Sequence, residues 1–505
     1  MSSQTLKEAR QYEEVYGKQI SPENRPKFHL SPRVGWMNDP NGFCMYGDKY
    51  HLFYQYHPYD AHWGPMHWGH ATSSDLLHWE FLPAALAPDE YYDKDGVFSG
   101  SAITLEDGRH LLMYTGVMKR TIENGQIGEF QTQCIAIGDG CDYEKFENNP
   151  VINSDAIPDG DSKTDFRDPK IIKKQDGSYR CLVANRAKDN SGQLLLFKSA
   201  DCIHWDFEKI FAKNEGRYGL MWECPDFFEL DGKGVLLTSP QDMLPEGFEF
   251  HNGNGNLCII GDFDSDTDTF SEEKVQAVDY GIDFYAMQTI LTADGRRVMI
   301  GWMQNWDTIW AHDGKEPWFG QMSLPRELSI KDGRLCQWPI RELTDMRADR
   351  VEYRDVLIDA KRRSDGNEKA TNTGTSLEGI AGRCLDMEIE VRPKDELFNR
   401  FVISIAADET YHTDIILMPH ENIAKIDRKF SGSRRAIVHQ RRAFIPWEDD
   451  VYRLRVVLDR YSMEVFFEGG KYVMTASLPT DVSCEGIYFN TNKDAFLNIV
   501  KYDLR

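Results

Sequence analysis

The stretch WMNDPNGFCMYGDKYHLFY, residues 36–54, contains the pattern that decides the fold. Near its beginning is an acid, Asp39, that is followed directly by Pro40. The turn pair Gly47-Asp48 then separates two runs that are rich in aromatic and apolar residues. A turn pair between two strand-like runs predicts a β-hairpin.

The same unit recurs along the chain. Asp-Gly pairs begin at residues 107, 176, 231 and 294, so that the intervals counted from residue 47 are 60, 69, 55 and 63 residues. A second echo, Asp-x-x-His-Trp, occurs at residues 75–79 and 201–205. Five hairpin units in roughly 300 residues predict a five-bladed β-propeller, because propellers contain about 4–8 four-stranded blades. A pair of β-sandwiches or a solenoid is the alternative.

The rest of the chain divides into segments that differ in amino-acid composition and pattern. Residues 1–27 are polar and include a segment, residues 6–16, that is expected to be helical. The propeller is expected at residues 28–338 and a short, charged, helical linker at residues 339–355. Residues 356–505 alternate again between apolar and polar positions, which predicts a β-sandwich. The predicted fold class is therefore all-β, a five-bladed β-propeller followed by a C-terminal β-sandwich.

Composition excludes several classes of function. The net charge of -24 disfavours binding to nucleic acid or to an anionic membrane surface. There is no apolar run of membrane-spanning length and no secretory signal, so a cytoplasmic protein is expected. The 10 Cys include no Cys-x-x-Cys pair, and the His residues between 51 and 70 match no zinc signature. Neither a metal nor a cofactor is predicted. The oligomeric state stays open, and the C-terminal region is a candidate surface for a homo-oligomer.

Three acids stand at one position of the repeat. Eight residues before the five turns lie Asp39, Ser99, Asp168, Glu223 and Ala286. A proline follows each acid within two residues. Each acid alone is best explained as a turn residue. Because they share one position of the repeat, we expect them to meet at the centre of the propeller. Carboxylates that lie close together repel one another, so their pKa values should differ.

Converging carboxylates are the usual device of glycoside hydrolases, in which one attacks the sugar or activates water and another protonates the leaving oxygen. Aromatic and amide side chains near the acids are candidates for binding a sugar, although for each aromatic alone core packing is the better explanation. These candidates are Trp36, Asn38, Gln55, Trp63, Trp68, Phe98, Tyr285, Trp302 and Trp318.

The motifs together resemble glycoside hydrolase family 32, which contains invertases, fructosidases and sucrose-6-phosphate hydrolases. Residues 36–42 match its sucrose box, residues 166–169 its Arg-Asp-Pro motif and residues 222–225 its Glu-Cys-Pro motif. Further blocks of the family are matched by residues 53–58, 67–70, 98–101 and 283–286. The resemblance covers nearly the whole chain and implies a five-bladed propeller followed by a β-sandwich.

The resemblance also implies residue roles. Asp39 would be the nucleophile, Glu223 the general acid/base, and Asp168, supported by Arg167, the stabiliser of the transition state. The fructose subsite would be lined by Asn38, Gln55, Trp63, Ser99 and Tyr285. The implied mechanism is retaining, for which the carboxyl groups of Asp39 and Glu223 should lie about 5–5.5 Å apart.

The expected substrates are small sugars: sucrose, sucrose 6-phosphate or short fructo-oligosaccharides. A phosphate would require Arg or Lys at the rim of the site, for which Arg33, Arg120 and Arg217 are candidates. Three other functions remain open: an inverting arabinoside or xyloside hydrolase on the same propeller, a fructosyltransferase, and a sugar-binding propeller without catalysis. The last requires the loss of at least one acid, and all three are present.

Overall fold

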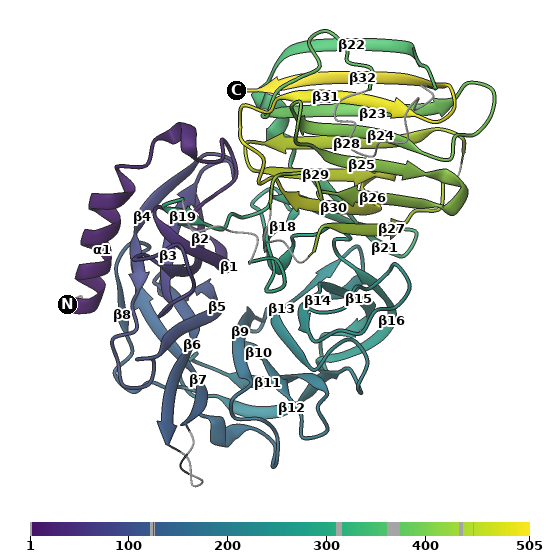
Figure 1. The fold of residues 1–505 in the computed structure, drawn as a ribbon. Coiled ribbons are helices and arrows are strands. Elements are labelled where there is room, and N and C mark those ends of the chain that lie inside the picture. Colours follow the sequence, from purple (N-terminus) through teal and green to yellow (C-terminus); the bar gives the residue numbers. More distant parts are fainter. Residues whose placement is uncertain are drawn as a thin grey trace.

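The structure is a computed structural model that describes residues 3–121, 125, 127–309, 316–360, 374–433, 438–447 and 449–505. Within these residues the chain forms seven β-sheets, five from residues 35–339 and two from residues 347–504. Figure 1 shows the two groups as distinct parts of the molecule, with the N-terminal helix α1 (Gln4–Gly17) on the outside of the first. The prediction of an all-β chain is confirmed.

Each of the first five sheets contains consecutive antiparallel strands, which neighbouring hairpins provide. The first sheet contains β1 (Gly35–Tyr46), β2 (Lys49–His57), β3 (His67–Ser73) and β4 (Trp79–Leu86); the second contains β5 (Gly96–Thr104), β6 (His110–Thr121), β7 (Ile127–Gly138) and β8 (Tyr143–Lys145); the third contains β9 (Phe166–Lys173), β10 (Tyr179–Arg186), β11 (Gly192–Ser199) and β12 (Asp206–Lys213); the fourth contains β13 (Met221–Leu230), β14 (Lys233–Gln241), β15 (Leu257–Asp264) and β16 (Thr269–Ala277); and the fifth contains β17 (Tyr285–Leu291), β18 (Arg297–Trp302), β20 (Arg326–Lys331) and β21 (Arg334–Pro339).

The predicted turns join the first two strands of every one of these sheets. Gly232 and Gly295 have φ of +78° and +83°, in the left-handed region that glycine enters without strain. The turn therefore reverses the chain at the place where the Asp-Gly pair predicts a reversal. Each hairpin then provides the first two strands of a sheet.

The first strands of the five sheets contact one another in sequence: β1 contacts β5, β5 contacts β9, β9 contacts β13, β13 contacts β17, and β17 contacts β1. Strand β19 (Trp318–Phe319) pairs in parallel with β1, so a late segment of the chain is tied to the first sheet. In Figure 1 the strands β1, β5, β9 and β13 accordingly lie toward the middle of the lower part. Side chains at the beginnings of these strands can therefore meet.

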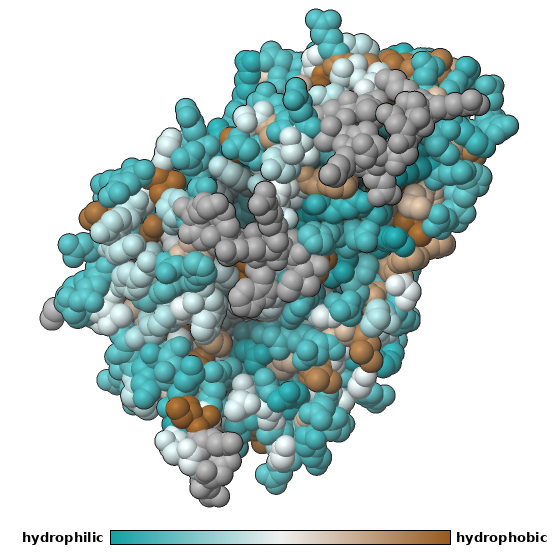
Figure 2. Space-filling view, viewed as in Figure 1, coloured by the Kyte–Doolittle hydropathy of each residue, from teal (hydrophilic) through white to brown (hydrophobic). Residues whose placement is uncertain are grey.

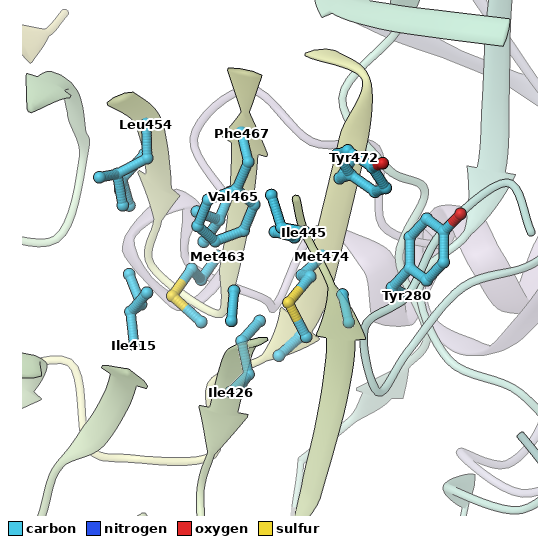
Figure 3. Packing of buried hydrophobic residues seen from close by; sticks show 14 of the residues in the cluster. Tyr280, Ile415, Ile426, Ile445, Leu454, Met463, Val465, Phe467, Tyr472 and Met474 are labelled. Atoms are coloured by element: carbon cyan, nitrogen blue, oxygen red, sulfur yellow. The ribbon is translucent and has the colours of Figure 1, made fainter. Parts of the chain in front are cut away.

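The second group consists of two sheets. One contains β22 (Arg347–Ile358), β32 (Ala495–Leu504), β23 (Leu385–Pro393), β28 (Tyr452–Asp459), β29 (Ser462–Phe467) and β30 (Tyr472–Ser477); the other contains β27 (Gln440–Phe444), β26 (Ile423–Asp427), β25 (Thr413–Met418), β24 (Phe401–Ala407) and β31 (Gly486–Thr491). Figure 3 shows Ile415 and Ile426 of the second sheet facing Met463, Val465 and Met474 of the first. Burial of these side chains holds the two sheets together.

The segment expected to be a helical linker, residues 339–355, differs in part from that expectation. Residues 339–355 contain the 3-10 helix η4 (Arg341–Met346), but from Arg347 onward they belong to β22, which pairs with β32. Charged residues dominate this strand, and most of its positions are only partly buried or exposed. Residues 1–27 also pack on the first sheet, because the buried Glu13 accepts a hydrogen bond from the backbone N of Ala84.

Buried ionic groups connect the two parts. His29 lies between Asp459 and Glu464, at 2.9 and 3.0 Å from their carboxylate oxygens. Arg326 of β20 donates to Glu464 at 2.8 Å and to Asp279 at 3.0 Å. Removal of one member of these buried ion pairs would leave an uncompensated charge. The ion pairs therefore favour one arrangement of the N-terminal and C-terminal sheets.

The face in Figure 2 is largely hydrophilic, with hydrophobic residues scattered over it. No helix in the described part of the chain is long and apolar enough to cross a membrane.

Candidate active site

The first strand of every sheet in the ring is interrupted by an irregularity near its beginning. The regular pairing shifts between Met37 and Pro40 in β1, between Phe98 and Gly100 in β5, between Arg167 and Lys170 in β9, between Glu223 and Asp226 in β13, and between Tyr285 and Gln288 in β17. Such bulges leave residues outside the ladder and redirect side chains. Proline has no N–H to donate to the ladder, and a bulge tolerates it because the ladder is already interrupted there.

The three acids occupy different places at these bulges. Asp39 is the second residue that the ladder of β1 skips, Asp168 is the first that β9 skips, and Glu223 is the last paired residue before the skipped Cys224. Asp168 and Cys224 share a positive φ, +63° and +49°, which marks them as the equivalent residues. Acids that lie equally far from their turns in sequence therefore occupy different positions in the strands, because the hairpin loops differ in length.

Asp39 is buried and its two carboxylate oxygens have separate donors. Asn38 Nδ2 donates to Oδ1 at 3.0 Å, and Ser99 Oγ donates to Oδ2 at 2.8 Å. The thiol of Cys224 lies 3.5 Å from the same Oδ2. Burial, followed by the charge of Glu223, raises the pKa of Asp39, while these three donors oppose the rise. The carboxylate is thus held in one orientation by groups from three strands.

Asp168 is fixed through both backbone and side chain. Its N–H donates to Thr115 Oγ1 at 2.9 Å, and its Oδ2 accepts the backbone N–H of Cys224 at 2.9 Å. Burial is the largest cause that raises the pKa of Asp168 to about 7, and the neighbouring Glu223 adds to it. Arg167 acts in the opposite direction.

Glu223 receives donors on both oxygens. Arg167 approaches the single oxygen Oε1 with both Nε, at 3.0 Å, and Nη2, at 2.9 Å. Tyr285 donates its hydroxyl to Oε2 at 2.7 Å. The Arg167 guanidinium also contacts Gln131 at 3.3 Å and Asp165 at 3.2 Å. A single buried cation therefore orients Glu223 and joins it to the wall of the site.

The three acids open into one cavity of about 360 Å³. Of the residues predicted from sequence, those that line it are Asn38, Asp39, Gln55, Trp63, Phe98, Ser99, Arg167, Asp168 and Glu223. Trp63 is half-exposed and meets the Phe98 ring edge to face at 6.4 Å. The cavity thus combines carboxylates, amides and an accessible aromatic wall, which is the combination a sugar requires.

Five predicted residues do not line the cavity. Trp36 and Trp68 are buried, and their indole N–H groups donate to Asn38 Oδ1 at 2.7 Å and to the Phe98 carbonyl at 3.1 Å. Tyr285 is fully buried, and its hydroxyl donates to Glu223 without lining the cavity. Trp302 is also fully buried, 5.2 Å from the Trp306 ring and 6.2 Å from the Trp36 ring. Trp318 packs against Tyr461 at 5.4 Å and donates to the carbonyl of Asn24, so it belongs to the junction of the two parts. Trp302 and Trp318 are core residues, in agreement with the expectation that a single aromatic residue more often packs in a core than binds a sugar.

Six further residues line the cavity and were missed in the sequence: Glu129, Gln131, Thr164, Asp165, Gln241 and Trp306. They belong to β7, to β14 and to connecting segments rather than to the first strands. No motif marks them, since their place depends on how neighbouring sheets pack. Trp306 alone carried a signal, because it follows Trp302 in the same aromatic-rich segment.

The site contains several carboxyl groups and one guanidinium cation. Among the described residues, no group of three or more His, Cys, Asp or Glu side chains is placed to hold a metal ion. Of the five His residues between 51 and 70, the buried pair His51 and His70 are hydrogen-bonded to each other at 3.0 Å. The chemistry offered by the cavity is proton transfer and nucleophilic attack by carboxyl groups.

Comparison with known families gives two matches that together cover most of the chain. The model of the glycosyl hydrolases family 32 N-terminal domain matches residues 29–339. The model of the C-terminal domain of the same family matches residues 353–503.

Two curated relatives come from Escherichia coli. A sucrose-6-phosphate hydrolase is 34% identical over 462 residues, which is 90% of this chain and 89% of the relative. A raffinose invertase is 41% identical over 323 residues, which is 64% of this chain and 66% of the relative.

The fold is also shared with solved structures. A mutant of a Bombyx mori GH32 beta-fructofuranosidase, in complex with sucrose, has 32% identity and a TM-score of 0.82, and the match covers 100% of this chain and 99% of that one. A sucrose-6-phosphate hydrolase from Lactobacillus gasseri has 25% identity and a TM-score of 0.81, with 100% and 97% covered.

Proposed function

The chain belongs to glycosyl hydrolase family 32, and on this premise we propose that it is a retaining β-fructofuranosidase that hydrolyses the terminal fructosyl bond of sucrose or a closely related fructoside. The observation that carries the proposal is the division of the carboxyl groups in the cavity. Asp39 is oriented by Asn38 and Ser99, whereas Glu223 is oriented by Arg167 and Tyr285. Two carboxyl groups with different partners can perform different steps.

In the first step Asp39 attacks the anomeric carbon of the fructosyl unit, and the bond from that carbon to the leaving oxygen breaks. Glu223, in its protonated form, gives its proton to the leaving oxygen, so a sugar with a free hydroxyl departs. An ester between fructose and Asp39 remains. The close contacts of Asn38 and Ser99 with Asp39 support this role, because they hold the attacking oxygen in place.

In the second step Glu223 accepts a proton from water, and the resulting hydroxide attacks the anomeric carbon. The ester bond breaks, and the Asp39 carboxylate and fructose are released. Asp168 stabilises the positive charge that develops on the fructosyl ring in both steps and accepts hydrogen bonds from ring hydroxyls. Its contact with the amide of Cys224 keeps one carboxylate oxygen fixed while the other is available to the sugar.

We also propose that the five sheets of residues 28–338 are the blades of one propeller and that the two C-terminal sheets form a sandwich. The contacts from β1 through β17 and back to β1 support closure of the ring. Strand β19 supports it as well, because it adds a segment from late in the chain to the first sheet. A division near residues 339–355 agrees with the limits of the two family matches.

The direct test is incubation of the purified protein with sucrose and kestose, followed by measurement of free fructose and of the anomer first released. Release of β-fructofuranose is expected, and an inverted anomer would contradict the role of Asp39 as nucleophile. Fructose-containing oligomers at high sucrose would instead indicate a transferase. Asp39→Asn should abolish turnover while the thermal unfolding curve stays cooperative, and Asp48→Asn, at an exposed turn, is the matched control.

A further inference from the structure

The cavity is rich in carboxyl groups. Five carboxyl groups line it, from Asp39, Glu129, Asp165, Asp168 and Glu223, against the single guanidinium of Arg167. That guanidinium is already engaged by Glu223 and Asp165. Among the described residues, no Lys or second Arg lines the cavity.

The three arginines considered for a phosphate lie elsewhere. Arg33 pairs with Glu14, and Arg217 pairs with Glu272. Arg120 lies over the Phe130 ring, with its guanidinium carbon 5.1 Å from the ring centre, and contacts the sulfur of Met118. None of them lines the cavity. A phosphate monoester carries a charge of about -1.5 to -2 at pH 7 and is normally held by guanidinium or N–H donors.

Glu129 differs from the other acids at the wall. Asp165 is neutralised by Arg167 and by Arg186, at 3.2 and 2.7 Å. Glu129 accepts a hydrogen bond from Gln131 Nε2 at 3.0 Å and forms no ion pair with any described residue. Glu129 therefore lines the cavity with no counter-ion among the residues that the structure describes.

Glu129 stands on the side of the cavity where Glu223 is held. Gln131, which donates to Glu129, accepts a hydrogen bond from Arg167 at 3.3 Å, and Arg167 in turn holds Glu223. Glu223 is the group that protonates the leaving oxygen in the proposed mechanism. A leaving sugar that is protonated by Glu223 would therefore lie on the same side of the cavity as Glu129.

We propose that Glu129 makes the enzyme selective for an uncharged leaving group, so that unphosphorylated fructosides are cleaved and the 6-phosphorylated form of sucrose is discriminated against. The proposal rests on the proposed function and specifies its substrate class. A carboxylate accepts hydrogen bonds from sugar hydroxyls, whereas it repels a phosphate dianion in the same cavity. This differs from the activity named for several relatives, which are sucrose-6-phosphate hydrolases.

The test compares kcat/KM for sucrose, sucrose 6-phosphate and raffinose. Raffinose carries a neutral galactosyl unit on the oxygen that carries the phosphate in sucrose 6-phosphate, so it reports the effect of bulk without charge. The kcat/KM for sucrose should exceed that for sucrose 6-phosphate by at least about tenfold. The kcat/KM for raffinose should also exceed that for sucrose 6-phosphate. A preference for the phosphorylated sugar would overturn the proposal. Equal loss with raffinose would also overturn it, because the discrimination would then come from size.

Variants assign the effect to Glu129. Glu129→Gln should reduce the ratio of kcat/KM for sucrose to that for sucrose 6-phosphate by at least about fivefold, whereas Glu129→Asp, which keeps the charge, should preserve most of it. Glu80→Gln, at an exposed position of β4, is the control and should leave the ratio unchanged. An unchanged ratio in Glu129→Gln would contradict the assignment.

Two further readouts keep the experiment decisive. If Glu129→Gln does not fold, competition in the wild-type enzyme replaces it: glucose should inhibit more strongly than glucose 6-phosphate, and the opposite order would refute the proposal. Absence of free fructose from all three substrates would contradict the proposed function itself. Fructose released preferentially from sucrose 6-phosphate would contradict only the role of Glu129.

Discussion

The thiol of Cys224 lies 3.5 Å from Asp39 Oδ2, although the two residues are 185 positions apart in the chain. The backbone N–H of the same cysteine donates to Asp168 at 2.9 Å. One residue of the bulge in β13 thus contacts two acids from other sheets. Burial raises the pKa of the Cys224 thiol well above its usual value, so the thiol stays protonated and can act as a donor.

Replacement of Cys224 by alanine should lower kcat by about five- to tenfold, which corresponds to about 1 kcal/mol for a lost donor. The thiol lowers the pKa of Asp39, so its loss should raise that pKa and move the acid limb of the pH–rate profile to higher pH. Cys224→Ser keeps a donor and should retain most activity. Identical profiles for the alanine and wild-type enzymes would show that the thiol does not act on Asp39.

Replacement of Tyr285 by phenylalanine removes the hydroxyl that donates to Glu223 Oε2 at 2.7 Å. Hydrogen bonds to charged groups contribute about 1.5–3 kcal/mol, so kcat/KM should fall about 10- to 100-fold. Tyr285 does not line the cavity, and KM should change less than kcat. A change confined to KM would mean that the residue binds sugar directly.

Asp168 should destabilise the folded protein at neutral pH. Its folded pKa of about 7 exceeds the usual value of 3.8, so between these values the folded state binds more protons and stability falls as pH rises. Asp168→Asn should remove this penalty and raise the free energy of unfolding at pH 8 by about 1–2 kcal/mol, while activity is lost. Below pH 4 the two proteins should be equally stable. Urea unfolding at both pH values measures this difference.

His29 should also make stability fall as pH rises, but in a higher pH range and at the junction of the two parts. Burial opposes its charge, but the bonds to Asp459 and Glu464 raise its pKa to about 9. The stabilisation is complete below the unfolded pKa of about 6.5 and is lost as pH rises through about 9, by about 3 kcal/mol in total.

The His29→Gln variant should lose this pH-dependent part of the stability. It should unfold more easily at pH 6 and show a flatter dependence between pH 6.5 and 9. A parallel curve for the variant would indicate that His29 is not charged in the folded protein. Urea unfolding over this pH range, with wild type as reference, distinguishes the two outcomes.

Much of the fold was accessible from local sequence. Five turn pairs predicted five hairpins, and all five join the first two strands of a sheet. The helix predicted at residues 6–16 is present as α1, where Ser3 accepts a hydrogen bond from Leu6 N. Strand β22 was missed because charged residues dominate it, and only its pairing with β32 makes it a strand.

The sequence by itself determined the five hairpins, their turns and the three acids, because turn chemistry and the alternation of apolar residues act over a few neighbouring residues. Tertiary structure alone decided which groups face each acid. Pairing and packing between sheets brought Glu129, Gln131 and Gln241 to the cavity and removed Trp302 and Trp318 from it. The bulges decided the rest: an unpaired residue in a strand changes where every following side chain points, and equal spacing in sequence does not record that change.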